Sequence, residues 1–126
     1  MLALPSSVRI YLAVGAVDLR KSIDGLCALV SERQHDLYSG HLYVFVSRRG
    51  DRLKILTWST GGFLLLYKRL ERGRFRLPQR RDGQAEVELD ATQLAMLLDG
   101  LDLKQVQPPR RWTPPSRQKV DASLSV

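Results

Sequence analysis

The sequence predicts an α+β domain: a small antiparallel sheet of four or five strands, with two helices packed on its one apolar face. Three short apolar runs follow one another within residues 42–70 and are separated by turn-like breaks, which is the pattern of an antiparallel meander. Two other segments carry apolar residues at helical spacing, one before these runs and one after them. With 126 residues, 44% apolar and 26% charged, the chain is long enough for one modest core.

The first part of the chain predicts a strand followed by a helix. Residues 8–14 are rich in β-branched and aromatic side chains and end at Gly15. An apolar helical stripe then runs from about Asp18, the expected N-cap, to Gln34. Gly25 lies inside this stripe and costs roughly 1 kcal/mol relative to alanine, which indicates that another group packs closely there.

The central strands are expected at residues 42–47, 52–58 and 63–70. The glycines of the two breaks, RRGD and STGG, can supply the positive φ that tight hairpin turns need. In the first break we expect Gly50 to bend the chain and Asp51 to hydrogen-bond the local backbone. Alternation along the middle run places apolar residues on one face and charge on the other face near the turn.

A short strand and a second helix are expected after the meander. Residues 86–89 have the composition of a strand. Asp90 and Gln93 have the spacing of a capping box, in which the two side chains bond each other's backbone N–H. Four leucines follow at helical spacing, and Gly100 is the expected end of the helix.

These elements predict one globular domain over residues 1–104. Residues 105–126 hold two proline pairs and a polar end, so we expect a Pro-rich, disordered tail. No apolar run is long enough for a membrane span, and Pro5 interrupts the apolar start, so we expect no signal peptide and no membrane partner. The one cysteine, Cys27, fits a cytoplasmic location.

The positive charge of the chain is concentrated in one central block. Between Arg48 and Arg81 the sequence holds 11 Lys/Arg and 2 Asp/Glu, whereas the rest of the chain has a small acidic excess. Such a block attracts polyanions, and nucleic acid is the first of these. The alternatives are a solvated face, a protein-contact surface or, least favoured, an anionic membrane.

No catalytic constellation is found in the sequence. There is no nucleophile elbow, P-loop or dinucleotide fingerprint. The two histidines, His35 and His41, flank an expected loop without a cysteine or an acidic cluster at ligand spacing, and Cys27 lies on the apolar helix stripe. We therefore expect no enzyme activity, no metal ligands and no cofactor.

Arginines crowd around the expected hairpin turns within the basic block, where they would repel one another without an acidic or polyanionic partner. Contacts of this kind to phosphates give affinity with little sequence specificity. Aromatic side chains lie among them, but strand aromatics more often face the core. The predicted DNA-binding residues are Arg48, Arg49, Arg52, Lys54, Lys68, Arg69, Arg72, Arg74 and Arg76.

Five motifs, spaced along about residues 4–103, resemble one known family. They are VRIYLAVGAVDLRKSIDGL, YSGHLYVF, RRGDRLKIL, YKRLERGRF and QLAMLLDGLD. The chain is similar to the TnpB accessory proteins encoded by the second reading frame of insertion-sequence family sixty-six transposons, which are distinct from the RNA-guided nuclease of the same name. The positions that match the family pattern include Arg20, Lys21, Asp24, Gly25, Arg49, Gly50, Asp51, Lys68, Arg69, Glu71, Arg72 and Gly73.

The resemblance implies a non-catalytic accessory protein for bacterial DNA transposition, encoded beside a larger transposase. DNA and the transposase of the same element are the partners that we expect, and a module that docks on the transposase without touching DNA is the alternative. Two positions depart from the family pattern, because Ser22 replaces a common glycine and Leu77 replaces a usual tryptophan. The tripeptide Arg49-Gly50-Asp51 also occurs in adhesion proteins, but the setting favours a turn that holds arginines out for a partner.

Overall fold

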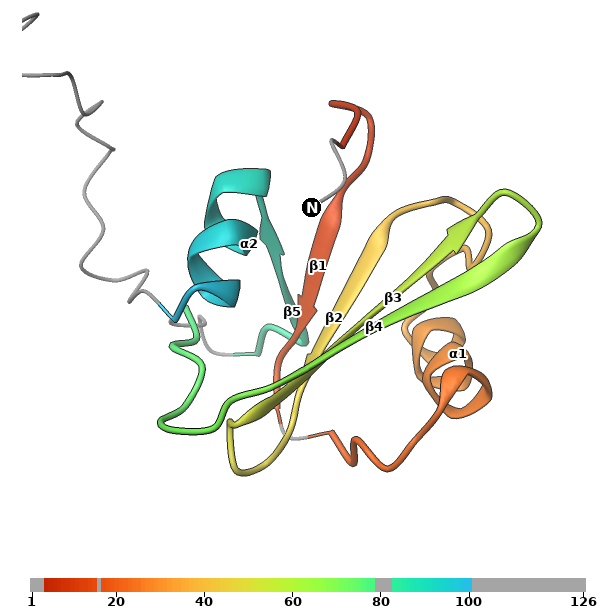
Figure 1. Cartoon of the computed structure of the whole chain (residues 1–126). Helices are drawn as coiled ribbons and strands as arrows, with labels where there is room; N and C mark the ends of the chain where they lie inside the picture. The colour runs from red at the N-terminus through yellow and green to blue at the C-terminus, as the bar shows by residue number, and fades with distance from the viewer. Residues whose placement is uncertain (1–3, 16, 79–82, 101–126) are drawn as a thin grey trace, which may run out of the picture.

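The computed structural model describes residues 4–15, 17–78 and 83–100, which form one five-stranded sheet with two helices (Figure 1). The strand order is β4-β3-β2-β1-β5; β1 runs parallel to β2, and the other neighbours are antiparallel. The α+β class and the meander within residues 42–70 are confirmed. The elements are β1 (Ile10–Ala13), α1 (Ile23–Glu32), β2 (Leu42–Val46), β3 (Arg52–Ser59), β4 (Gly62–Arg69), β5 (Glu86–Leu89) and α2 (Ala91–Leu98).

The central strand β2 is buried on both faces, because all five of its side chains are buried. Its alternate residues Leu42, Val44 and Val46 pack in one cluster with residues of α2. Tyr43 and Phe45 pack in a second cluster with residues of α1. The two helices therefore cover opposite faces of the sheet, as Figure 1 also shows, and the expectation that both lie on one face is wrong. The continuous apolar run LYVFV is typical of a strand that is buried on both sides.

Helix α1 begins later than predicted, at Ile23, and its N-cap is Ser22 rather than Asp18. The φ of Ser22 is −93°, a conformation open to any residue, so the serine needs no glycine-like freedom here. The close approach expected at Gly25 is confirmed, since a Cβ at this position would lie 3.1 Å from Cβ of Lys21.

Helix α2 has the predicted capping box. The backbone N–H of Gln93 donates to the Asp90 carboxylate at 2.7 Å, and the backbone N–H of Asp90 donates to the Gln93 side chain at 2.9 Å. The cap fixes where α2 begins directly after β5, so that Leu94 and Leu97 reach the cluster on the face of the sheet opposite α1.

The hairpin between β3 and β4 is closed by a two-residue turn. Thr60 and Gly61 have φ values of 36° and 81°, which is the positive-φ pair of a type I′ turn, and Gly62 already belongs to β4.

Within the described ranges, no helix is long and apolar enough to cross a bilayer. The predicted boundary at residue 104 and the tail at 105–126 lie outside the described residues.

Candidate nucleic-acid interface

The RRGD break forms the tight turn between β2 and β3. The N–H of Gly50 donates to the Ser47 carbonyl at 2.9 Å, and Gly50 has a φ of 78°, which glycine adopts without steric cost. Arg48 and Arg49 are therefore exposed at the tip of the turn. The Asp51 carboxylate accepts from the Ser47 hydroxyl at 3.4 Å. Asp51 thus bonds a neighbouring side chain, whereas the sequence predicted a bond to the local backbone.

The segment that follows β4 is fixed to this turn by two backbone hydrogen bonds. The N–H of Leu70 donates to the Asp51 carbonyl, and the N–H of Phe75 donates to the Gly50 carbonyl, both at 2.7 Å. The Phe75 ring is buried in the same cluster as α2. The Arg74 side chain lies against Gly50, where an added Cβ would come within 3.4 Å of Cβ of Arg74. Two segments distant in sequence thus form one end of the sheet.

Most of the predicted contact residues are exposed on these two segments. Arg52 and Arg69 lie directly opposite each other on β3 and β4, which places two like charges side by side. Glu71 offsets part of this repulsion because it lies 3.5 Å from the Arg69 guanidinium. We call this cluster the arginine end, and its members are Arg48, Arg49, Arg52, Arg69, Arg72, Arg74 and Arg76.

The two predicted lysines do not belong to the arginine end. Nζ of Lys54 donates to the carbonyls of Leu19 and Lys21 at 2.7 and 2.8 Å, so Lys54 holds the loop before α1 against β3. Nζ of Lys68 donates to the Leu98 carbonyl at the C-terminus of α2, where a cation is favourable. Both ammonium groups already have structural partners.

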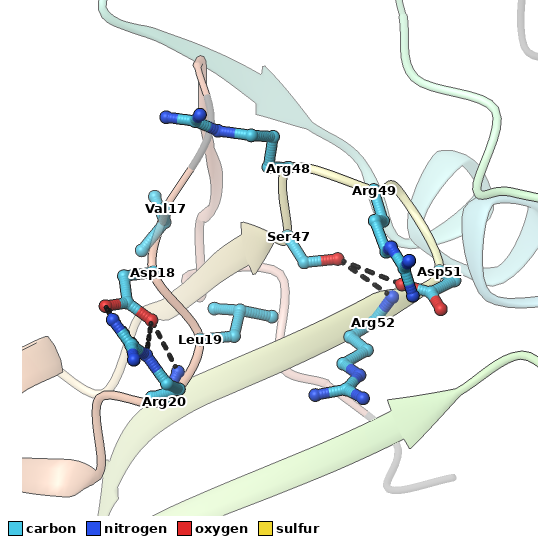
Figure 2. A pocket seen from close by; sticks show the side chains of 9 residues that line it. All are labelled: Val17, Asp18, Leu19, Arg20, Ser47, Arg48, Arg49, Asp51 and Arg52. Carbon is cyan, nitrogen blue, oxygen red and sulfur yellow. Dashed lines mark hydrogen bonds and ion pairs between the residues drawn. The ribbon is translucent and has the colours of Figure 1, made fainter.

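The loop after β1 also reaches the arginine end. Val17 pairs with Ser47 in a parallel bridge, and between their segments lies an open hollow of about 480 Å³. Figure 2 shows Arg20 folded back on Asp18 on one side of the hollow and the RRGD turn on the other. The residues that line it are Val17, Asp18, Leu19, Arg20, Ser47, Arg48, Arg49, Asp51 and Arg52.

Sequence reasoning did not include Arg20 among the contact residues. Only the parallel pairing of β1 with β2 brings the loops that follow these two strands together, and residue spacing carries no signal of that pairing. The match of Arg20 to the family pattern was the one available pointer.

Some of the charged side chains around the hollow form ion pairs with one another, and others do not. Arg20 donates to both oxygens of the Asp18 carboxylate, with contacts of 2.9 to 3.2 Å, and its backbone N–H donates at 3.0 Å. These bonds from Arg20 lower the pKa of Asp18 to about 2, so the pair is ionised and locally neutral. In the part of the chain that the structure describes, no side-chain hydrogen bond or ion pair engages the guanidinium groups of Arg48, Arg49 or Arg52.

The two histidines and the cysteine lie in structural settings. Nε2 of His35 lies 2.7 Å from the Glu86 carboxylate, and Nδ1 of His41 accepts from the backbone N–H of Arg9 at 3.0 Å. Burial raises the pKa of the Cys27 thiol, which disfavours the reactive thiolate. Among the described residues no group of three His, Cys, Asp or Glu is placed to hold a metal ion. The exposed guanidinium groups of the arginine end are of the kind that binds anions.

Comparison with known proteins decides the family. The model of the IS66 Orf2 like protein family matches residues 8–108, which is most of the chain. The chain belongs to the IS66 Orf2-like family. Members of this family are accessory proteins associated with the transposition of insertion sequences, and the resemblance seen in the sequence motifs is confirmed.

Two curated relatives, both from Sinorhizobium fredii (strain NBRC 101917 / NGR234), are similar to this IS66 Orf2-like protein over most of its length. Uncharacterized protein y4jC is 37% identical over 101 residues, covering 79% of this chain and 85% of the relative. Uncharacterized protein y4hO is 36% identical over 116 residues, covering 90% and 96%. No solved structure matches the chain.

The Asp18–Arg20 pair gives a prediction for acid titration. Because the folded pKa of Asp18 lies below its ordinary value of 3.8, its contribution to stability is present above pH 4 and is lost as the pH falls towards 2. A ¹³C titration of the Asp18 carboxyl should show a midpoint near 2, and the Arg20→Gln variant should move that midpoint up towards 3.8. An unchanged midpoint in the variant would show that Arg20 does not hold the carboxylate.

Lys54 should stabilise the fold and not contribute to DNA affinity. Lys54→Met removes the donor for two carbonyls and should lower the free energy of unfolding by about 1–3 kcal/mol in urea titration. Arg49→Met is the matched control, and as an exposed tip residue it should change stability by less than about 0.5 kcal/mol. Equal stabilities for the two variants would contradict the assigned role of Lys54.

Proposed function

We propose that this IS66 Orf2-like protein assists transposition by binding DNA phosphates through its arginine end. The observation that carries the proposal is the convergence of three arginine-bearing segments at one end of the sheet: the RRGD turn, the end of β4 and the segment after it. Two backbone hydrogen bonds between Gly50–Asp51 and Leu70–Phe75 fix that convergence. The role is non-catalytic, and the transposase of the same element is the proposed protein partner.

The chemistry of the arginine end suits phosphate. A guanidinium offers a planar fork of N–H donors that matches two phosphate oxygens, and it stays charged at every physiological pH. Arg52 and Arg69 face each other, so a bound anion between or beside them would relieve their repulsion. Contacts to phosphate fix position on the duplex but carry no sequence information, which predicts low sequence specificity.

The hollow beside the RRGD turn adds a second feature that supports phosphate binding. Arg48, Arg49 and Arg52 line it, the carboxylate of Asp18 is already paired with Arg20, and the carboxylate of Asp51 accepts from the Ser47 hydroxyl. Backbone phosphates are the groups that protrude from a duplex. A phosphate at the mouth of this hollow would meet free guanidinium groups without displacing an internal ion pair.

Docking on an acidic surface of the transposase is the alternative function, and one observation favours it. Arginines of this end and of the neighbouring loop already hold carboxylates within the chain, since Arg69 binds Glu71 at 3.5 Å and Arg20, in the loop after β1, binds Asp18 at 2.9 Å. A partner's aspartates and glutamates would fit the same forks. Co-purification with the transposase in the presence of nuclease distinguishes the two functions. A complex that survives nuclease favours protein docking, and one that is lost favours DNA bridging.

Salt-dependent binding to short duplex DNA tests the proposal. The slope of log K against log salt should fall by about 1 for each phosphate contact removed, so Arg49→Gln should bind more weakly and less steeply than wild type. Arg9→Gln is the matched control, because Arg9 precedes β1 at the far end of the sheet and pairs with Glu88 at 3.1 Å.

Comparison of element-end DNA with random DNA in the same titration measures specificity, and similar affinities are expected. Absence of binding at low salt, or equal losses in the Arg49→Gln and Arg9→Gln variants, would exclude DNA contact through the arginine end.

A further inference from the structure

Strand β4 is an open edge of the sheet. It is the last strand in the order β4-β3-β2-β1-β5, and its ladder with β3 runs without a bulge from Arg69 to Gly62. In an antiparallel pair only every second residue of β4 hydrogen-bonds β3, so the backbone groups of the other residues point outward. Among the described residues no other segment bonds these outward groups of 62–69. An edge of this length is a template for pairing with another strand.

The side chains of β4 lack the devices that usually protect an edge. Leu64, Leu66 and Tyr67 are 36%, 44% and 53% exposed. The strand contains no proline, and its charges are confined to its last two residues, Lys68 and Arg69. Natural edge strands are commonly short, bulged or charged along their length, and β4 is none of these. An apolar strand without a bulge and with one open edge indicates an interface.

We propose that β4 pairs in antiparallel fashion with β4 of a second copy of this chain. A two-fold axis perpendicular to the sheet at Leu66 would place Leu66 opposite Leu66 and Lys68 opposite Leu64. The apolar centres of the two strands then meet, and the two cationic ends lie at opposite ends of the ribbon. This pattern selects the antiparallel arrangement, because parallel pairing would bring the Lys68–Arg69 ends together and like charges in facing positions are destabilising.

A groove beside β4 provides room for the side chains of the second copy. It has a volume of about 430 Å³ and lies between β4 and α2, with Leu66, Ala95 and Leu98 among its lining residues. Lys68 also lines it, and Leu64 of the second copy would lie opposite Lys68 in the proposed register. Burial of Leu64 and Leu66 from both copies would remove exposed apolar surface at about 25 cal/mol per Å².

The pairing has a geometric consequence for the arginine end. A two-fold axis perpendicular to the sheet keeps each face of the sheet on its own side. The α1 faces of both copies would therefore form one surface, with Arg52 and Arg69 of each copy at its two ends. This interface does not depend on DNA binding, so the two proposals fail separately.

Sedimentation of the full chain at increasing concentration tests the interface. Wild type should reach the mass of a dimer, and Leu66→Lys should halve that mass, because it places two lysines opposite each other at the two-fold axis. Leu64→Glu should retain the dimer, since the new carboxylate would face Lys68 of the second copy. Ser31→Lys, on the exposed side of α1, is the matched control for added charge and should also remain dimeric.

Circular dichroism of each variant separates loss of the interface from loss of the fold. A folded wild-type chain that stays monomeric at every concentration would overturn the proposal, whether residues 101–126 or another protein then cover β4. A dimer that persists in folded Leu66→Lys would place the interface elsewhere and would equally overturn it.

Discussion

Two backbone hydrogen bonds determine where the charge of this protein lies. They join the carbonyls of Gly50 and Asp51 to the N–H groups of Phe75 and Leu70, both at 2.7 Å. Each contributes a net stabilisation of about 1 kcal/mol, and burial of the Phe75 ring adds about 2–3 kcal/mol. Repulsion between two exposed guanidinium groups in water is about 1 kcal/mol at 4 Å and is screened by salt. The stabilisation from these two hydrogen bonds and from Phe75 burial therefore exceeds the repulsion between the arginines that they bring together.

The parallel pairing of β1 with β2 places the loop after β1 beside the arginine end. Both strands run in the same direction and end at the same end of the sheet. The loop that holds Asp18 and Arg20 therefore lies beside the turn that holds Arg48 and Arg49. Lys54 fixes this loop by bonding the carbonyls of Leu19 and Lys21. Lys54 lies within the basic block, but it positions this loop and does not add a free charge to the surface. The same division applies to Lys68, which binds the C-terminus of α2.

Local signals in the sequence predicted most elements but not their arrangement. The hairpin turns and the Asp90 capping box were correct, because each depends on residues that are close in sequence. The start of α1 was misplaced because an aspartate at position 18 resembles a cap, whereas its carboxylate binds Arg20 instead. Burial of β2 on both faces was missed, although its run of five apolar residues indicated it. The pairing of distant strands, and with it the place of Arg20, could not be derived from spacing.

The central claim is that DNA meets the protein at the arginine end, and a map of amide chemical shifts during titration with a short duplex tests it most directly. The amides of residues 17–20, 47–52 and 69–76 should shift together at low salt and return towards their free positions as salt is added. Shifts centred on β5 and α2, or no shifts at low salt, would contradict the claim.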